Sequence, residues 1–236
     1  MLSLVALSLD GQSADLPRLV GDGVADDTDA IQSRLDLGMP CVYLPPPKVR
    51  YVISRPLEIG SRQEIRLDRF SEVVLKPGSN CHMLRNRNRT EGDRHVAVVG
   101  GIWNFDNANQ FPNPWLVDLV EDSRFASKAT TQGLPPRDRW PVLSRGGAEG
   151  YDGMCMRFDN VRDFVMRDVV IRNPATFGFC GSRISYFVID GVEFDYDHCN
   201  PFRANMDGIH LDGGSHHGKI SNLRGACFDD LLALNA

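Results

Sequence analysis

A repeated four-residue pattern limits the fold of this chain more than any other feature of its sequence. Each copy has an apolar residue at both ends and two small or polar residues between them. The copies are VGGI at 99–102, MRDV at 166–169, IDGV at 189–192 and ISNL at 220–223. Imperfect repeats about 20–30 residues apart, built from strands and turns without a helical period, indicate a solenoid. The pattern predicts an all-β parallel β-helix in which equivalent residues of successive coils stack; a β-sandwich of irregular hairpins is the alternative.

We expect the coils to form a single domain over residues 1–236. Its parts are a helix region at 21–38, a long loop insertion at 104–150, and further coils at 151–236. Three short segments rich in β-branched or aromatic residues, CVYLP, RYVIS and EVVLKP, follow the helix region as strands. Trp115 and Trp140 lie in the insertion, where they either line a binding cleft or pin the loop to the coils.

The helix region begins with GDGVADDTDAIQSRLDLG. Gly21-Asp22-Gly23 is predicted to be a turn. Ile31 and Leu35 are four residues apart and share one helix face, and Gly38 ends the helix. The side-chain oxygens available for the N-cap belong to Asp26, Asp27 and Thr28.

Charge and cysteine content exclude several classes of partner. The formal net charge of -5 argues against nucleic acid, whose binding requires clustered positive charge. No run approaches the ~18 apolar residues of a membrane-spanning helix. The six cysteines match no zinc signature. Most are expected to be small buried residues, and the alternative that two of them form one disulfide bond is left open.

Three aspartates fall at spacings that a β-helix would bring together. Asp207 opens DGIHL and Asp230 opens DLLAL, and they are 23 residues apart, the same spacing as Met166 and Ile189. Neighbouring strands lie ~4.8 Å apart, so we expect Asp207 beside Asp230, with Asp229 next to them. Three like charges this close do not all ionise cheaply. A protonated acid beside an ionised base is what glycoside hydrolysis needs; ordinary turn aspartates are the alternative.

Two motifs carry a family resemblance that covers the chain from about Gly21 to its end. GDGVADDTDAIQ resembles the opening of pectate-lyase-superfamily proteins, in which a small helix caps the first coil. NMDGIHL followed by FDDLLAL resembles the paired motifs of glycoside hydrolase family 28, the polygalacturonases and their relatives. The resemblance implies a right-handed parallel β-helix with a short N-terminal capping helix.

The same resemblance implies a function and roles for four residues. Asp229 would be the general acid, Asp207 and Asp230 would activate water with inversion of the anomeric centre, and Asn205 would support the site. The carboxyl of Asp229 and that of at least one of Asp207 and Asp230 are then expected ~6.5–9.5 Å apart. The implied substrate is an acidic or pectin-type polysaccharide, with no cofactor and no metal. The implied location is secreted or periplasmic, although the apolar run over residues 1–9 lacks the basic leader of a secretory signal.

The chain departs from the family pattern in several places. Met206 stands where the family has Thr, and Leu231 stands where it usually has Cys. The Gly-His-Gly and Arg-x-Lys motifs, which help to bind the substrate carboxylate on the following coils, do not occur. We therefore expect a β-helix truncated at its C-terminal end, or one whose C-terminal face is covered by another subunit in a homo-oligomer.

Further substrate-binding candidates lie near these motifs: His210, His217 and Arg183. His210 is expected one strand position from the Asp207 site, packed against its surroundings. His216 and His217 are expected in a loop, from which one of them could line the cleft.

Two other functions remain open. The chain could be a non-catalytic, tailspike-like module that binds polysaccharide. It could also be a calcium-dependent polysaccharide lyase, for which Arg183 and Lys219 are the nearest candidate bases. Release of reducing sugar separates a hydrolase from a binding module, and absorbance of an unsaturated product separates it from a lyase.

Overall fold

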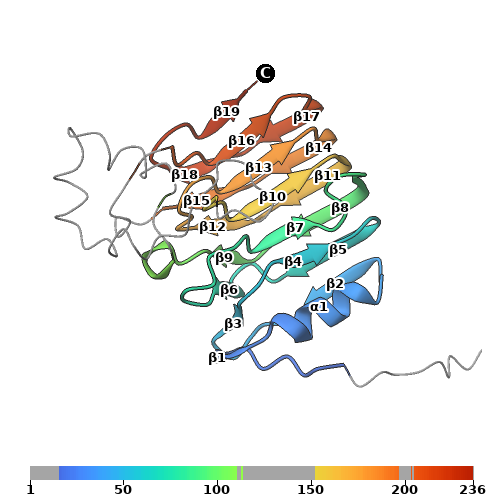
Figure 1. Cartoon of the computed structure of the whole chain (residues 1–236), viewed down its shortest axis with the longest axis vertical. Coiled ribbons are helices and arrows are strands. Elements are labelled where there is room, and N and C mark those ends of the chain that lie inside the picture. Colours follow the sequence, from blue (N-terminus) through green and yellow to red (C-terminus); the bar gives the residue numbers. More distant parts are fainter. Residues whose placement is uncertain (1–15, 111–112, 114–151, 197–202, 204, 236) are drawn as a thin grey trace, which may run out of the picture.

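The structure is a computed structural model that describes residues 16–110, 113, 152–196, 203 and 205–235. Three parallel sheets, here called A, B and C, run the length of the molecule (Figure 1). From β2 onward the chain passes from sheet B to sheet A to sheet C and then returns to sheet B on the next coil. This path is a right-handed parallel β-helix, as the repeat and the resemblance predicted.

Each sheet takes one strand from each coil. Sheet A, in spatial order, contains β1 (Asp22–Asp26), β3 (Arg50–Ile53), β6 (Glu72–Leu75), β9 (Ile102–Asn104), β12 (Val170–Arg172), β15 (Glu193–Asp195) and β18 (Arg224–Ala226). Sheet B contains β17 (His216–Ser221), β14 (Ser185–Asp190), β11 (Val161–Arg167), β8 (Asp93–Val99), β5 (Gln63–Leu67) and β2 (Cys41–Leu44). Sheet C contains β19 (Leu232–Leu234), β16 (Ile209–Asp212), β13 (Phe179–Ser182), β10 (Met156–Asp159), β7 (Leu84–Asn86) and β4 (Leu57–Ile59).

All strand pairings among the described residues are parallel. The β-sandwich of hairpins is therefore wrong, because hairpins pair antiparallel strands. The three segments expected to be strands after the helix region are confirmed as β2, β3 and β6.

The predicted helix is α1 (Thr28–Asp36), and it packs over the first coil (Figure 1). Ile31 and Leu35 are fully buried on its inner face, and Gly38 follows the helix with a φ of 68°. The amphipathic pattern and the stop signal are both confirmed.

The start of the helix region differs from the sequence prediction in its turn and agrees with it in one of the three residues offered as a cap. The predicted Gly-Asp-Gly turn is wrong, because β1 begins at Asp22 and pairs irregularly with β3. Asp27 is the N-cap residue and makes no side-chain cap hydrogen bond, whereas Asp26 Oδ1 accepts from the amide of Thr28, the first helical residue, at 3.0 Å. The Asp27 carboxylate instead accepts from the amide of Val20 at 2.6 Å.

The repeated quartets mark the corner where the chain leaves sheet B for sheet A. Strand register pairs Met166 with Ile189 and Ile189 with Ile220, which confirms the last three copies. Met166 also pairs with Val98 rather than Val99, so the first copy is shifted by one residue. With this shift the third positions stack, and all adopt positive φ: Gly100 at 74°, Asp168 at 55°, Gly191 at 67° and Asn222 at 55°. Gly, Asn and Asp tolerate this left-handed conformation best, which explains why small or polar residues recur there.

Replacing Gly100 with Ala should destabilise the fold more than replacing Gly38 with Ala. Both glycines have positive φ, so both substitutions carry about 1–2 kcal/mol of backbone strain. A Cβ at Gly38 meets nothing within 4 Å, whereas one at Gly100 would press on the carbonyl oxygen of Leu67. Urea denaturation of both variants measures the difference; equal losses would show that the corner moves freely to accept a side chain.

Aromatic side chains fill the middle of the β-helix. Phe158 and Phe179 belong to sheet C and Phe164 belongs to sheet B. The centroids of their rings lie 4.7–5.8 Å apart. All three are fully buried. Their burial joins consecutive coils into one continuous core, which is what holds a solenoid together.

The cysteines are less buried than predicted. Cys155 and Cys180 are buried, and burial raises the pKa of both thiols. Cys41 is exposed, and Cys81 and Cys227 are half-buried. The expectation that most cysteines are buried is therefore wrong for these five, all of which are free thiols; Cys199 lies outside the described residues.

The insertion predicted at 104–150 begins where β9 ends and includes a short 3₁₀ helix, η1 (Asn107–Asn109). Trp115 and Trp140 lie outside the described residues, so both interpretations of them stay predictions. In the part of the chain that the structure describes, no helix is long and apolar enough to cross a membrane.

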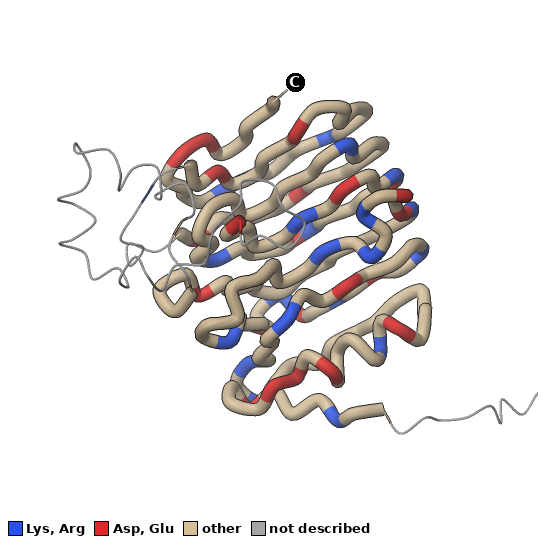
Figure 2. Tube along the Cα trace, viewed as in Figure 1, with Lys and Arg blue, Asp and Glu red and all other residues tan. Residues whose placement is uncertain are grey.

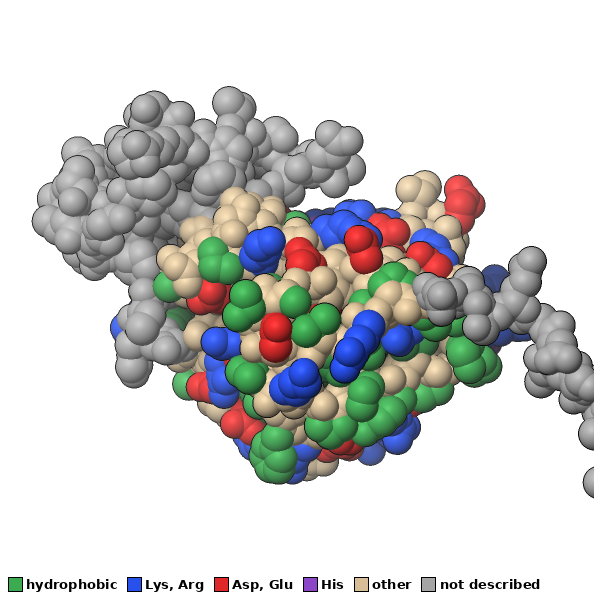
Figure 3. Space-filling model, turned by 90° about the horizontal axis from the view of Figure 1, so that it is seen from below, with side chains coloured by type: hydrophobic (Ala, Val, Ile, Leu, Met, Phe, Trp, Pro, Cys, Tyr) green, Lys and Arg blue, Asp and Glu red, His purple; other side chains and the backbone are tan. Residues whose placement is uncertain are grey.

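The end of the molecule that carries β1 and α1 has a mixed surface, on which apolar and charged side chains alternate (Figure 3). Exposed apolar side chains of the first coil are Val24, Leu37, Met39, Tyr43 and Val49. Because charged side chains separate the apolar ones, this end does not define a docking surface.

Candidate active site

The three predicted aspartates come together at one edge of sheet C. Asp207 leads into β16, and Asp229 and Asp230 lead into β19, in an acidic segment between β18 and β19 (Figure 2). β16 pairs with β19 so that Ile209 lies opposite Leu232, and the amide of Gly208 donates to the carbonyl of Asp230 at 2.9 Å. The predicted one-coil stacking of Asp207 and Asp230 is therefore confirmed.

One carboxylate oxygen from each of these aspartates lies within 4.8 Å of the other two. This limit joins one oxygen of each side chain, so the expected ~6.5–9.5 Å between acid and base carboxyl groups stays a prediction. The group offers three oxygens to a cation, whereas Ca²⁺ takes about six to eight. Other groups would have to supply most of a calcium shell.

The three carboxylates differ in exposure. Asp207 is 3% exposed, whereas Asp229 and Asp230 are exposed to solvent. Asp207 Oδ1 accepts from the Asp230 amide at 3.3 Å, and its Oδ2 lies 2.6 Å from His210 Nδ1. The Tyr196 hydroxyl donates to the Asp207 carbonyl at 2.7 Å, which fixes the backbone. The site therefore combines one immobilised carboxylate with two that solvent and a ligand can reach.

His210 lies beneath this cluster, packed as the sequence predicted. Its imidazole is 8% exposed and stacks on Phe177 with ring centroids 4.0 Å apart and an interplanar angle of 7°. Nε2 lies 3.2 Å from Asp212 Oδ1 and 2.9 Å from Asn235 Nδ2. The hydrogen bond to Asp207 raises the pKa of His210 against the effect of burial, and Asp212 adds to the rise. Both ring nitrogens are thus occupied within the protein.

The other predicted site residues are Asn205, His217 and Arg183, and they lie in three different parts of the coils. Asn205 is half-buried, two residues before Asp207, with a φ of 52°. His217 is in β17 of sheet B, so the expected loop position is wrong, and its ring stacks on Tyr186 at 4.8 Å. Arg183 is in the corner between sheets C and B, where Nε donates to Asn160 Oδ1 at 2.6 Å. The structure therefore brings His210 into contact with Asp207, leaves Asn205 two residues before Asp207 in the chain, and places His217 and Arg183 past the opposite ends of the sheet C strands.

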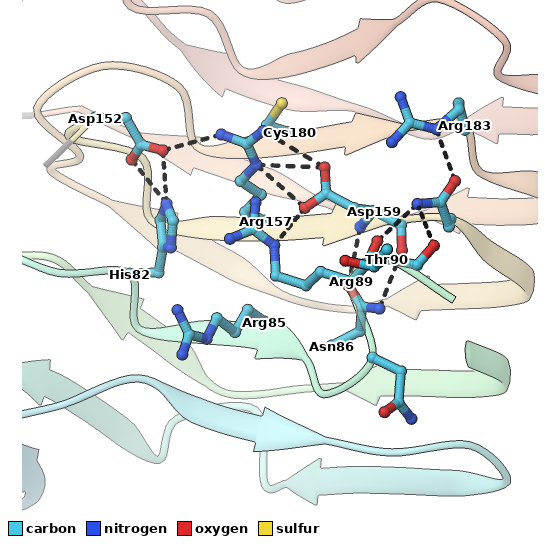
Figure 4. A network of polar contacts seen from close by, with 12 residues as sticks. His82, Arg85, Asn86, Arg89, Thr90, Asp152, Arg157, Asp159, Cys180 and Arg183 are labelled. Carbon is cyan, nitrogen blue, oxygen red and sulfur yellow. Dashed lines mark hydrogen bonds and ion pairs between the residues drawn. The ribbon is translucent and has the colours of Figure 1, made fainter. Parts of the chain in front are cut away.

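A second polar group on the outer side of sheet C was not predicted from the sequence (Figure 4). Arg157 in β10 lies between two carboxylates, 3.1 Å from Asp152 and 3.2 Å from Asp159. His82 Nε2 lies 2.7 Å from Asp152, and Arg89 Nε lies 2.6 Å from Asp159. The alternation in MRFD, with Met156 and Phe158 buried, is the signal that places Arg157 and Asp159 on the outer face.

Fold and site together thus define the class of protein: a parallel β-helix with a carboxylate cluster at the edge of one sheet. No protein-family model and no curated protein matches the chain. Among solved structures, the family 28 exopolygalacturonase of Yersinia enterocolitica is similar at 16% identity and a TM-score of 0.64, over 91% of this chain and 43% of that one. The hyperthermoactive exopolygalacturonase of Thermotoga maritima is similar at 15% identity and a TM-score of 0.63, over 91% and 51%.

A candidate glycosyl hydrolase from Parabacteroides merdae is also similar, at 13% identity and a TM-score of 0.54, over 88% of this chain and 94% of that one. At these identities the likeness establishes a shared polygalacturonase-like β-helix fold. The chain spans about half of the length of the two exopolygalacturonases.

Proposed function

We propose that this chain carries the acid–base site of a glycoside hydrolase that cleaves an acidic or pectin-type polysaccharide. The observation that supports this most directly is the meeting of three carboxylates from two consecutive coils, one buried and two exposed. A cluster of like charges at an exposed edge is unfavourable for stability, and acid–base chemistry is a reason to keep it.

In this proposal Asp229 donates a proton to the glycosidic oxygen as the bond from that oxygen to the anomeric carbon breaks. A water molecule gives up a proton to Asp207 or Asp230 and attacks the anomeric carbon from the opposite face. The product then has the inverted configuration. Asn205 supports the site through hydrogen bonds. NMR of the first product formed tests this inversion directly, and a retained configuration contradicts it.

The substrate panel that tests the proposal contains polygalacturonate, methylated pectin, alginate and a neutral glucan. A hydrolase releases reducing ends from an acidic member of the panel without forming a product that absorbs as an unsaturated uronide. A lyase forms that product and loses activity in chelator. Binding without either signal identifies the tailspike-like module. Lyase activity, or binding without any product, contradicts the proposal.

A further inference from the structure

We propose that His210 is a positioning residue that orients Asp207 for catalysis through its Nδ1 atom. This inference rests on the proposed hydrolase function. It starts from an asymmetry among the three aspartates: only Asp207 is buried, and it is the one whose carboxylate oxygen meets a ring nitrogen, at 2.6 Å.

The orientation of His210 is fixed on three sides. Phe177 covers one face of the imidazole in a nearly parallel stack, which prevents the ring from tilting. Asp212 and Asn235 lie at Nε2, so the ring cannot rotate to offer that nitrogen to Asp207 without losing them. The Nδ1–H donor is therefore held toward Asp207 Oδ2. A donor held in advance adds no ordering cost when the substrate binds.

The coil above holds the other oxygen of the same carboxylate. The Asp230 amide donates to Asp207 Oδ1, so the two oxygens of Asp207 are bound from two directions. This leaves the carboxylate plane with one orientation relative to the exposed pair on β19. His210 thereby distinguishes the buried, immobile carboxylate of Asp207 from the exposed carboxylates of Asp229 and Asp230.

Two conservative substitutions separate the two ends of the imidazole. In His210→Asn the amide nitrogen occupies nearly the place of Nδ1 and still donates to Asp207. In His210→Gln the amide reaches the place of Nε2 and contacts Asp212 instead. We expect His210→Gln to lower kcat about 10–100-fold with little change in KM, and His210→Asn to stay within a few-fold of the parent, because a small misplacement of a catalytic group costs on this scale. Glu91→Gln, an exposed carboxylate in the corner before β8, is the control and is expected to equal the parent.

The inference is overturned if the two variants lose kcat equally, or if the loss appears in KM alone, since then His210 acts by packing or by contact with substrate. Thermal unfolding of each variant checks that it is folded. A test that does not depend on activity is the low-field proton NMR resonance expected from the short hydrogen bond between His210 Nδ1 and Asp207 Oδ2. It should be present in the parent and in Glu91→Gln, and absent in Asp207→Asn. A resonance that survives Asp207→Asn contradicts the pairing, whereas an inactive parent with the expected resonances contradicts only the hydrolase proposal.

Discussion

Asp229→Asn is expected to lower the hydrolysis of the accepted polysaccharide about 10²–10⁴-fold, the usual contribution of general acid catalysis. The amide keeps the size of the side chain and cannot donate a proton as a carboxylic acid does. The substitution also removes one of three crowded charges, and Asp229 is exposed. The folded state should therefore be as stable as the parent or slightly more stable. Initial rates from reducing-end release, together with the unfolding midpoint of each protein, measure both effects.

Glu91→Gln provides the matched control for this variant. Glu91 is also an exposed carboxylate, but it lies in the corner before β8, away from the edge of sheet C that holds the aspartates. We expect its activity to equal that of the parent. If Asp229→Asn retains activity within a few-fold of Glu91→Gln, Asp229 is not the acid, and Asp230 becomes the candidate for that role.

The register of the β-helix could be predicted from the sequence where two coils have equal length. Asp207 and Asp230 are 23 residues apart, and stacking at that offset followed directly. The same reasoning misplaced the first quartet by one residue, because Gly100 and Gly101 both adopt a left-handed φ and fit either frame, and only the pairing of Val98 with Met166 selects one.

Positions around the coil could not be predicted in the same way. His217 is close to Asp207 in sequence and Arg183 lies about one coil before it, yet a corner turns each of them away from the aspartates. A repeat pattern gives the height of a residue along the axis, whereas the corner conformation decides which sheet it belongs to. Predicting the contact between His210 and Asp207 would have required both the height along the axis and the sheet of each residue. The two residues flank the start of β16, and Phe177 lies on the preceding coil.

The polar group on the outer side of sheet C has a different role from the aspartate cluster, because its charges are paired. Arg157 bridges Asp152 and Asp159, and the side chain of Asp159 is only 7% exposed. Burial acts to raise the pKa of Asp152, but the charge and hydrogen bond of His82, with help from Arg157, hold it below its ordinary value. Paired, hydrogen-bonded charges of this kind are costly to break from one side.

Arg157→Met should therefore lower the free energy of unfolding by about 3 kcal/mol at neutral pH, at the lower end of the cost of removing one partner from a buried ion pair. The methionine fills part of the space of the arginine stem but leaves two carboxylates without their shared cation. Because the pKa of Asp152 is lowered in the folded state, its ionic contribution is present above its unfolded pKa of about 3.9 and is lost as the pH falls through the folded value. The difference between parent and variant should thus shrink below about pH 4. Urea denaturation at neutral pH and at pH 3 measures both quantities.

Arg172→Met is the matched control on sheet A. Arg172 also lies near two carboxylates, 2.8 Å from Asp195 and 3.5 Å from Glu72, but its closest partner is 48% exposed. Solvent screens such a pair, and we expect a loss of about 0–1 kcal/mol. Equal losses in the two variants would show that burial of the carboxylates does not strengthen the Arg157 group. A larger loss from Arg157→Met that persists at pH 3 would assign its effect to packing of the arginine stem rather than to charge.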